Sequence, residues 1–170
     1  WNHRGPGSGC NPAHHYFDGI LLQEWSPEHG LFGPVENIYC GTVLGLSEGP
    51  HVFKRGGWYY LTVAEGGTGY NHAVTMARSR SIHGPYETHP QKHLLYAGNA
   101  PQNPLQKTGH GQYVETPDGM PYHTFLTGRP LDTPDRACPL GRETGLAKCV
   151  WTEDGWLYLA HGGTVANLEV

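Results

Sequence analysis

The sequence lacks the features of several large classes of protein. No run of 18 apolar residues occurs in the 170-residue chain, so no helical membrane span is predicted. Charged residues make up 15% of the chain, and the net charge of −4 leaves no basic surface for nucleic acid. The opening at Trp1 has no Met, charged segment or apolar segment, so no signal peptide is predicted.

Recognisable metal and redox motifs are also missing. The four cysteines (Cys10, Cys40, Cys138 and Cys149) show no C-x-x-C spacing, which argues against a zinc ribbon or a redox pair. Scattered reduced thiols are the favoured interpretation of these cysteines, and a disulfide bond is the alternative. The twelve histidines form no H-x-x-x-H pair on a predicted helix, so they do not indicate a zinc enzyme.

Turn residues and aromatic residues are abundant instead. The chain has 25 Gly, 14 Pro, ten Tyr and five Trp, and the turn residues separate short aromatic or β-branched runs. This pattern predicts an all-β fold. Residues 1–17 are rich in Gly, Pro and His and are predicted to form a loop. Single strands are expected at 19–25, 34–38 and 73–79, with a short edge strand within 81–88.

Three hairpins suggest a repeated unit. The expected hairpins pair residues 51–54 with 58–64, 112–115 with 122–127, and 148–151 with 156–159. Asp-Gly turns favour the second and third of these hairpins. Glu48 and His110 are 62 residues apart, about the length of one four-stranded propeller blade. The third hairpin follows after only about 35–40 residues, which makes the repeat irregular. Two to three blades would fit in this chain, whereas closed propellers have roughly four to eight.

Glu48 is the strongest candidate for chemistry. It lies in the run 46–51 (LSEGPH), just before the aromatic strand 57–64. Partial burial of a carboxyl group raises its pKa and suits a proton donor near neutral pH. Gly49 and Pro50 would fix the backbone beside it. The alternative is an ordinary turn carboxylate.

Several motifs resemble the β-xylosidase branch of glycoside hydrolase family 43, in the family's order and over essentially the whole chain. They are 47–51 (SEGPH), 64–72 (AEGGTGYNH), 77–81 (ARSRS) with 84–87 (GPYE), 107–111 (KTGHG), 126–130 (LTGRP) and 138–144 (CPLGRET). The resemblance implies a five-bladed β-propeller, with its middle to last blades in residues 1–162. Residues 163–170 would begin a final strand or a linker toward a C-terminal β-sandwich that is missing here.

The resemblance also implies a function. It is inverting removal of terminal β-1,4-linked xylose from xylo-oligosaccharides, with α-L-arabinofuranosidase side activity. Relatives in this branch are often intracellular, which favours a cytoplasmic location over secretion. The expected partner is a xylo-oligosaccharide or an arabinoside, without nucleic acid or membrane, and an oligomer stays open for the full-length protein.

Individual positions take their expected roles from the same resemblance. Glu48 matches the general acid, Thr68 lines the pocket for the terminal sugar, His110 lies near the channel centre, and Arg142 binds the sugar. Arg129 could bind in the same way as Arg142 or serve a structural role in its loop. Trp58 could stack on a sugar, although alternate strand aromatics more often pack between blades.

Two family carboxylates have no match in this sequence. The family uses a base Asp, an Asp that tunes the acid, and the acid Glu. The five Asp residues lie in hairpin turns (Asp118, Asp154), in a Pro-rich loop (Asp132, Asp135) and before the first strand (Asp18). The base and the tuning residue would therefore lie upstream of Trp1, and we expect negligible turnover from these 170 residues alone.

No cofactor is expected to be required. A Ca²⁺ ion held through water near His110 is a weak hypothesis, because one imidazole does not supply the six to eight oxygen ligands that Ca²⁺ prefers.

Two competing functions stay open at this level. One is a non-catalytic carbohydrate-binding propeller that keeps the acid motif, which the absence of an upstream Asp would favour. The other is an enzyme whose main substrate is an arabinofuranoside. Assays on 4-nitrophenyl β-xyloside and α-arabinofuranoside would separate these functions.

Overall fold

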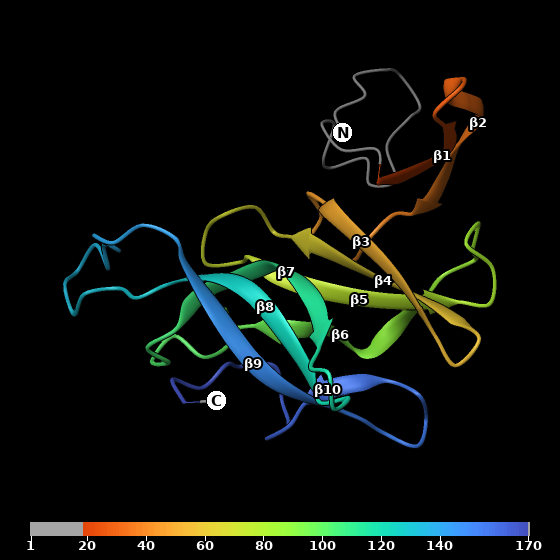
Figure 1. The fold of residues 1–170 in the computed structure, drawn as a ribbon. Coiled ribbons are helices and arrows are strands. Elements are labelled where there is room, and N and C mark those ends of the chain that lie inside the picture. Colours follow the sequence, from red (N-terminus) through yellow and green to blue (C-terminus); the bar gives the residue numbers. More distant parts are fainter. Residues whose placement is uncertain (1–18, 170) are drawn as a thin grey trace.

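The computed structural model describes residues 19–169, and within that range it contains ten β-strands and no helix (Figure 1). The predicted all-β fold is confirmed. The strands form one two-stranded sheet and two four-stranded sheets, and paired strands are antiparallel. We call β3–β6 the first blade and β7–β10 the second blade.

The strand bounds follow the chain in simple up-and-down order. The hairpin consists of β1 (Ile20–Ser26) and β2 (Gly30–Tyr39). The first blade consists of β3 (Glu48–Arg55), β4 (Trp58–Glu65), β5 (Ala73–Ser79) and β6 (Glu87–Tyr96). The second blade consists of β7 (Gln106–Glu115), β8 (Pro121–Gly128), β9 (Glu143–Trp151) and β10 (Leu157–Leu159).

Three sequence predictions need correction. The strand expected at 34–38 is the longer β2, because it pairs with β1 from Ser26 to Ile20. Residues 81–86 form a turn, and the edge strand is β6, which begins at Glu87. The second and third hairpins belong to the same sheet, since β8 pairs with β9. The irregular repeat therefore reflects two hairpins of one blade and does not mark the start of a third.

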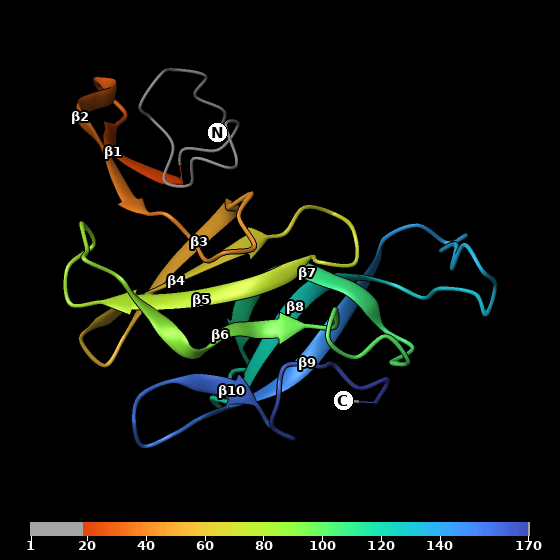
Figure 2. The same cartoon turned by 180° about the vertical axis from the view of Figure 1, so that it is seen from behind.

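The three sheets are layered. In both views the β1–β2 hairpin lies on the side of the first blade that faces away from the second blade (Figures 1 and 2). β7 lies against β4, β5 and β6, which brings the two blades face to face. β4 is buried from Tyr60 to Glu65 because both of its faces are covered. Such a strand is expected to be apolar on both faces.

Two apolar clusters hold these layers together. One lies between the blades and includes Tyr60, Met76 and Leu95 from the first with Phe125 and Leu157 from the second. The other joins the hairpin to the opposite face of the first blade, through Ile20, Ile38, Leu61, Val63 and Ala77. Burial of these side chains is the main stabilising term, at about 1.5–3 kcal/mol for each large apolar side chain.

The cysteines differ from the sequence interpretation at one position. Cys40 is disulfide-bonded, so its interpretation as a reduced thiol is wrong, whereas Cys138 and Cys149 are free. Disulfides depend on two Cα atoms lying within about 7 Å, which spacing along the chain does not reveal. Cys10, Asp18 and the predicted loop 1–17 lie outside the described residues. Within residues 19–169 there is no helix able to cross a membrane.

Candidate active site

Glu48 begins β3 and is half-buried. It pairs with Ala64, whereas His51 pairs with Thr62, so β3 carries one extra residue between Glu48 and His51. Such a β-bulge bends a strand and changes the direction of the side chains beside it. Gly49, inside the bulge, has a φ of 55°, a region where glycine is favoured.

His110 lies on β7 in an unusual backbone conformation. Its φ is 48°, and the pairing of β7 with β8 shifts register on both sides of Gly109. Positive φ is uncommon outside glycine, and it concentrates at functional positions when the surrounding structure maintains it. A Cβ added to Gly49 would lie 2.7 Å from His110 Nε2. The His110 imidazole therefore lies directly over Gly49, beside Glu48.

The glycines that flank His110 accommodate other histidines. A Cβ on Gly109 would come within 2.2 Å of the His72 ring, and one on Gly111 would come within 2.5 Å of His123. Because Gly109 and Gly111 have no side chains, two buried rings pack against β7, and His110 itself is exposed.

His72 belongs to this cluster and was missed by the sequence analysis. Its Nδ1 lies 3.0 Å from the Lys107 carbonyl oxygen, so Nδ1–H donates and Nε2 is left as the acceptor. Burial lowers the pKa of His72; His110 and Arg142 lower it further, while the Lys107 carbonyl and Glu48 oppose the shift. The ring is therefore neutral near pH 7, and it lies within electrostatic range of Glu48, His110 and Arg142. Its place at the end of the 64–72 motif is the signal that could have revealed it.

Two further histidines extend the cluster. Burial lowers the pKa of His51, and the neighbouring His110 lowers it further. Burial also lowers the pKa of His123 to about 4. His123 donates from Nδ1 to the Thr124 carbonyl oxygen at 2.8 Å. With these rings neutral, Arg142 supplies permanent positive charge near His72, which is also within electrostatic range of Glu48.

The remaining predicted site residues differ in their placement. Thr68 is exposed in the loop between β4 and β5, and Arg142 is exposed immediately before β9. Arg129 forms a bidentate ion pair with Glu143, with nitrogen–oxygen distances of 3.0 and 2.7 Å. That pairing supports the structural alternative for Arg129.

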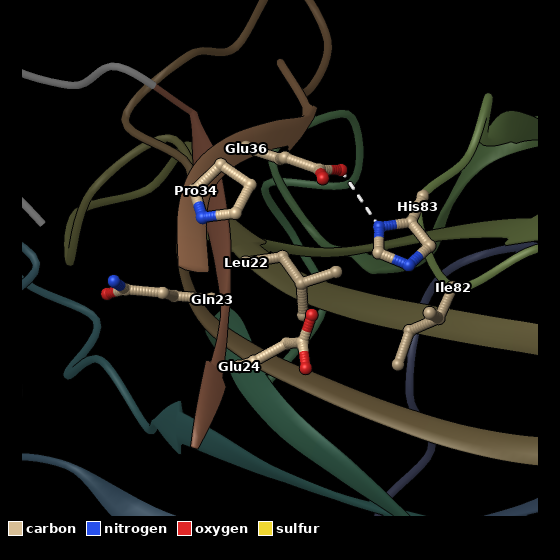
Figure 3. Close-up of a pocket in the computed structure, with 7 residues that line it drawn as sticks. All are labelled: Leu22, Gln23, Glu24, Pro34, Glu36, Ile82 and His83. Atoms are coloured by element: carbon tan, nitrogen blue, oxygen red, sulfur yellow. Dashed lines mark hydrogen bonds and ion pairs between the residues drawn. The ribbon is translucent and has the colours of Figure 1, made fainter. Parts of the chain in front are cut away.

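A surface pocket lies away from this cluster, between the β1–β2 hairpin and the turn before β6 (Figure 3). His83 and Glu36 are joined there by a hydrogen bond of 2.8 Å between Nδ1 and a carboxylate oxygen. Its other lining residues are Leu22, Gln23, Glu24, Pro34 and Ile82. Glu48, His110 and Arg142 are not among them, so this pocket is separate from the candidate site.

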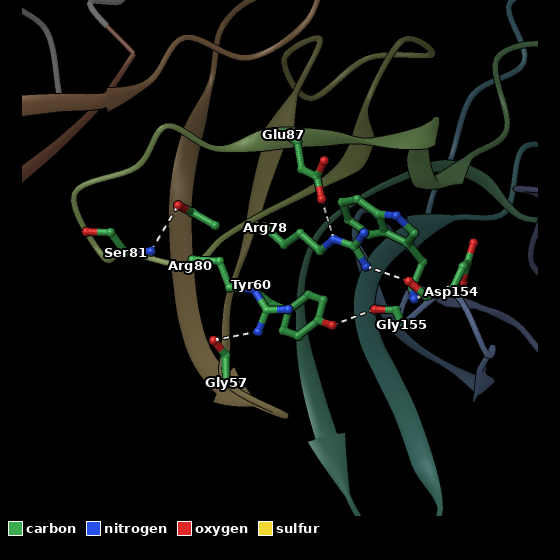
Figure 4. Close-up of polar contacts among 10 residues, drawn as sticks. Gly57, Tyr60, Arg78, Arg80, Ser81, Glu87, Asp154 and Gly155 are labelled. Carbon is green, nitrogen blue, oxygen red and sulfur yellow. Dashed lines mark hydrogen bonds and ion pairs between the residues drawn. The ribbon is translucent and has the colours of Figure 1, made fainter.

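Trp58 lies at the far end of the first blade. It pairs with Arg55, six residues along β4 from the partner of Glu48. That separation corresponds to about 20 Å of strand. The Arg78 and Arg80 guanidinium groups lie over its ring, at 4.3 and 3.8 Å from the centroid. Figure 4 shows that Arg78 also contacts Glu87 and Asp154. The structure thus does not bring Trp58 to Glu48.

The described aspartates also lie in structural positions. Asp118 accepts a hydrogen bond from Thr116 at 2.6 Å, and Asp154 accepts one from Thr152, both within hairpin turns. Asp135 accepts one from Thr133 at 2.7 Å in the loop before β9. Across residues 19–169, no three His, Cys, Asp or Glu side chains gather as a metal site. The imidazole and guanidinium groups around His110 fit Ca²⁺ poorly, because that ion prefers oxygen ligands.

The fold defines the chain as part of a β-propeller, with the candidate site residues gathered where strands of neighbouring blades meet. Residues 4–157 match the family model described as Glycosyl hydrolases family 43, and the chain belongs to that family.

Known proteins support this membership. A xylosidase/arabinosidase of Humicola insolens is 56% identical over 86% of this chain and 27% of its own length. A β-xylosidase of Bacillus subtilis is 44% identical over 100% of this chain and 32% of its own. The crystal structure of a xylan β-1,4-xylosidase from Bacillus halodurans matches with a TM-score of 0.86 and 52% identity, over 92% of this chain and 30% of that one. The chain thus spans about a third of the length of its relatives.

Proposed function

We propose that the full-length protein is a glycosidase that removes terminal β-1,4-linked xylose from xylo-oligosaccharides with inversion, and that Glu48 is its general acid. The observation that carries the proposal is the position of Glu48 at the β3 bulge, beside His110 and within electrostatic range of His72, which is itself within range of Arg142. The xylosidase names of several relatives support the substrate class.

In this mechanism Glu48 protonates the glycosidic oxygen as the bond to the leaving group breaks. A second carboxylate must activate water from the opposite face, about 6.5–9.5 Å from the acid. The described aspartates occupy turns and a loop, so we assign the base and the acid-tuning Asp to residues outside the described range. The described residues alone would therefore lack half of the mechanism.

The neighbours of Glu48 would bind the sugar. Arg142 keeps its charge at all relevant pH values and presents a planar set of donors for hydroxyl groups. Thr68 would line the pocket of the terminal sugar, and His110 would contact it near the centre of the propeller. No step is assigned to a metal.

An arabinofuranoside is the second candidate substrate. A non-reducing end α-L-arabinofuranosidase of Bacteroides ovatus is 39% identical over 86% of this chain, and the Humicola relative carries both activities in its name. We therefore include α-L-arabinofuranosidase activity, as a side or main activity, in the proposal. The values of kcat/KM for 4-nitrophenyl β-xyloside and 4-nitrophenyl α-arabinofuranoside show which of the two activities is the main one.

The test of the acid is Glu48→Gln in the full-length enzyme. General acid catalysis contributes about 10²–10⁴-fold, so kcat for xylobiose should fall by that order. The loss on 4-nitrophenyl β-xyloside should be much smaller, because 4-nitrophenolate departs without a proton. Glu36→Gln, in the separate surface pocket, is the control and should leave both rates unchanged.

Equal rates for Glu48→Gln and wild type would rule out this assignment of the acid. Sugar binding without turnover by the wild-type protein on any of these substrates would instead favour the carbohydrate-binding propeller.

A further inference from the structure

Glu65, at the end of β4, is a fully buried carboxylate. Four donors converge on it. Oε1 accepts from the Thr42 backbone N–H at 2.6 Å and from the Ser47 hydroxyl at 2.9 Å. Oε2 accepts from the Thr42 hydroxyl at 2.9 Å and from the Thr75 hydroxyl. A carboxylate has about four lone-pair positions, so its accepting capacity is filled.

These donors are all neutral groups, which is unusual for a buried acid. The Thr75 hydroxyl gives its proton to Glu65, so it accepts from Nδ1–H of His93 at 2.8 Å. The network thus extends from His93 on β6, through Thr75 on β5, to the carboxylate on β4. Burying an acid in this way is expensive unless it is fully hydrogen-bonded.

The network holds the segment 40–47 that leads into Glu48. Thr42 lies near the start of that segment, and Ser47 is the residue immediately before Glu48. A Cβ on Gly41 would lie 2.2 Å from Glu65 Oε1, so the Gly41 backbone packs directly against the carboxylate. Both ends of the segment are therefore anchored to one side chain.

The anchored segment is conformationally strained. Leu46, two residues before Glu48, has a φ of 56°, in the left-handed region that non-glycine residues rarely adopt. Such a conformation is energetically unfavourable and persists only where the surroundings impose it. Here the Gly45 carbonyl accepts from Gly66 N–H at 2.9 Å, and Ser47 is held by Glu65. These bonds flank Leu46 on both sides.

Glu65 also begins the second loop of the candidate site. Gly66 follows it directly, and the loop that carries Thr68 and His72 starts there. One buried carboxylate therefore lies next to two segments of the candidate site, the one that leads into Glu48 and the loop that begins at Gly66.

We propose that Glu65 is the positioning residue for the general acid: by anchoring Thr42 and Ser47 it fixes the direction of Glu48. The proposal rests on the proposed function of Glu48. Glu65 itself is enclosed and does not touch substrate.

The test is Glu65→Gln in the full-length enzyme, assayed on xylobiose and on 4-nitrophenyl β-xyloside. The amide keeps the volume but replaces an acceptor with a donor that faces hydroxyl and N–H groups. Misplacing a catalytic group by about 1 Å can cost 10²-fold, so kcat for xylobiose should fall by about that factor. The fall on 4-nitrophenyl β-xyloside should stay below about fivefold, because that leaving group needs little help from an acid.

Tyr60→Phe is the matched control. It removes one buried hydrogen bond, from the Tyr60 hydroxyl to the Gly155 carbonyl, at the opposite end of β4. Its rates on the two substrates should stay in the wild-type ratio. Ser47→Ala removes a single bond to Glu65 and should show the same leaving-group dependence as Glu65→Gln with a smaller loss, even if Glu65→Gln folds poorly.

Equal losses on both substrates in Glu65→Gln and Ser47→Ala, or no loss in either, would overturn the positioning role. If Glu48→Gln itself shows no leaving-group dependence, the general-acid assignment fails instead. The two failures are therefore distinguishable.

Discussion

Gly49 and Gly56 lie on one strand–turn segment and adopt nearly the same backbone conformation, with φ of 55° and 56°. Their surroundings differ. A Cβ on Gly49 would meet the His110 ring at 2.7 Å, whereas a Cβ on Gly56 would meet nothing within 4 Å. The pair separates the effect of backbone strain from the effect of contact with His110.

We predict that Gly49→Ala and Gly56→Ala in the full-length enzyme lose similar stability, about 1–2 kcal/mol each, because both force alanine into the left-handed region. Only Gly49→Ala should displace His110, and its kcat/KM on xylobiose should fall by at least about tenfold. Thermal melting and steady-state kinetics measure the two effects. Equal kinetic losses in both variants would show that the His110 contact is unimportant.

At the residue scale, sequence motifs identified Glu48 and His110 but not His72 or Glu65. The last two are defined by burial and by partners distant in the sequence. The donors to Glu65 come from residues as far as 23 positions before it, and no local pattern marks them. The glycines that flank His110 belong to the motif 107–111, but which ring each one accommodates depends on tertiary packing.

At the element scale, Arg78 links the two blades at the end opposite Glu48. Its guanidinium lies between the Trp58 and Trp156 rings, 4.3 and 4.0 Å from their centroids. It donates from Nε to Glu87 at 2.6 Å and from a terminal nitrogen to the Asp154 carbonyl at 2.8 Å (Figure 4). Trp58 and Glu87 belong to the first blade, whereas Trp156 and Asp154 belong to the β9–β10 turn region of the second.

We predict that Arg78→Lys lowers the stability of the full-length enzyme by about 1–3 kcal/mol, because a lysine cannot keep the stacking and the forked donors together. Arg80→Lys is the control, since Arg80 is exposed and stacks on Trp58 alone. Thermal melting should show the larger decrease for Arg78→Lys, and kcat on xylobiose should change little. A smaller decrease for Arg78→Lys than for Arg80→Lys would contradict this linking role.

The sequence predicted hairpins better than edge strands, for a physical reason. Asp-Gly turns identify the β7–β8 and β9–β10 connections directly. β2 and β6 contain Pro34 and Pro90, and a proline lowers strand propensity because it cannot donate to a ladder. Both strands are at the edges of their sheets, where a missing donor is tolerated. The full lengths of β2 and β6 are therefore defined only by their pairing with neighbouring strands in the structure.

At the scale of the whole molecule, buried neutral histidines join the layers. His89 on β6 accepts from Gln91 N–H through Nδ1 and donates from Nε2 to the Leu157 carbonyl of the second blade, both at 3.0 Å. Burial lowers the pKa of His89 to about 4, as it does for His123. An unfolded histidine has a pKa near 6.5.

The sign of the resulting pH dependence follows from these values. Between about pH 6.5 and pH 4 the unfolded chain takes up protons that folded His89 and His123 do not, so stability falls as the pH falls. Each such histidine contributes a slope of up to about 1.4 kcal/mol per pH unit in that window.

We predict that the melting temperature of the full-length enzyme falls from pH 7 to pH 5, and that His89→Gln falls less. Glutamine retains a donor and an acceptor but does not titrate, so the variant should be closer to wild type at pH 5 than at pH 7. Melting curves at pH 7 and pH 5 measure the difference in melting temperature between the variant and the wild type. A difference in melting temperature that is the same at both pH values would show that His89 does not cause the loss of stability in acid.

The propeller itself was predictable from turn spacing and motif order, because each blade repeats the same up-and-down unit. The face-to-face contact of the blades was not, since it depends on which side of each strand is buried. Tyr60 and Met76 of the first blade meet Phe125 and Leu157 of the second through side chains whose partners are 49 or more positions away.

The neutral donors around Glu65 have a consequence for solution conditions. Dissolved salt screens exposed ion pairs such as Arg129–Glu143, but it does not reach a carboxylate that is fully enclosed and held by hydroxyl and backbone groups. The geometry of the segment 40–47 that leads into Glu48 should therefore be independent of ionic strength. Salt effects on the enzyme would then report on the exposed Arg142 and on substrate binding.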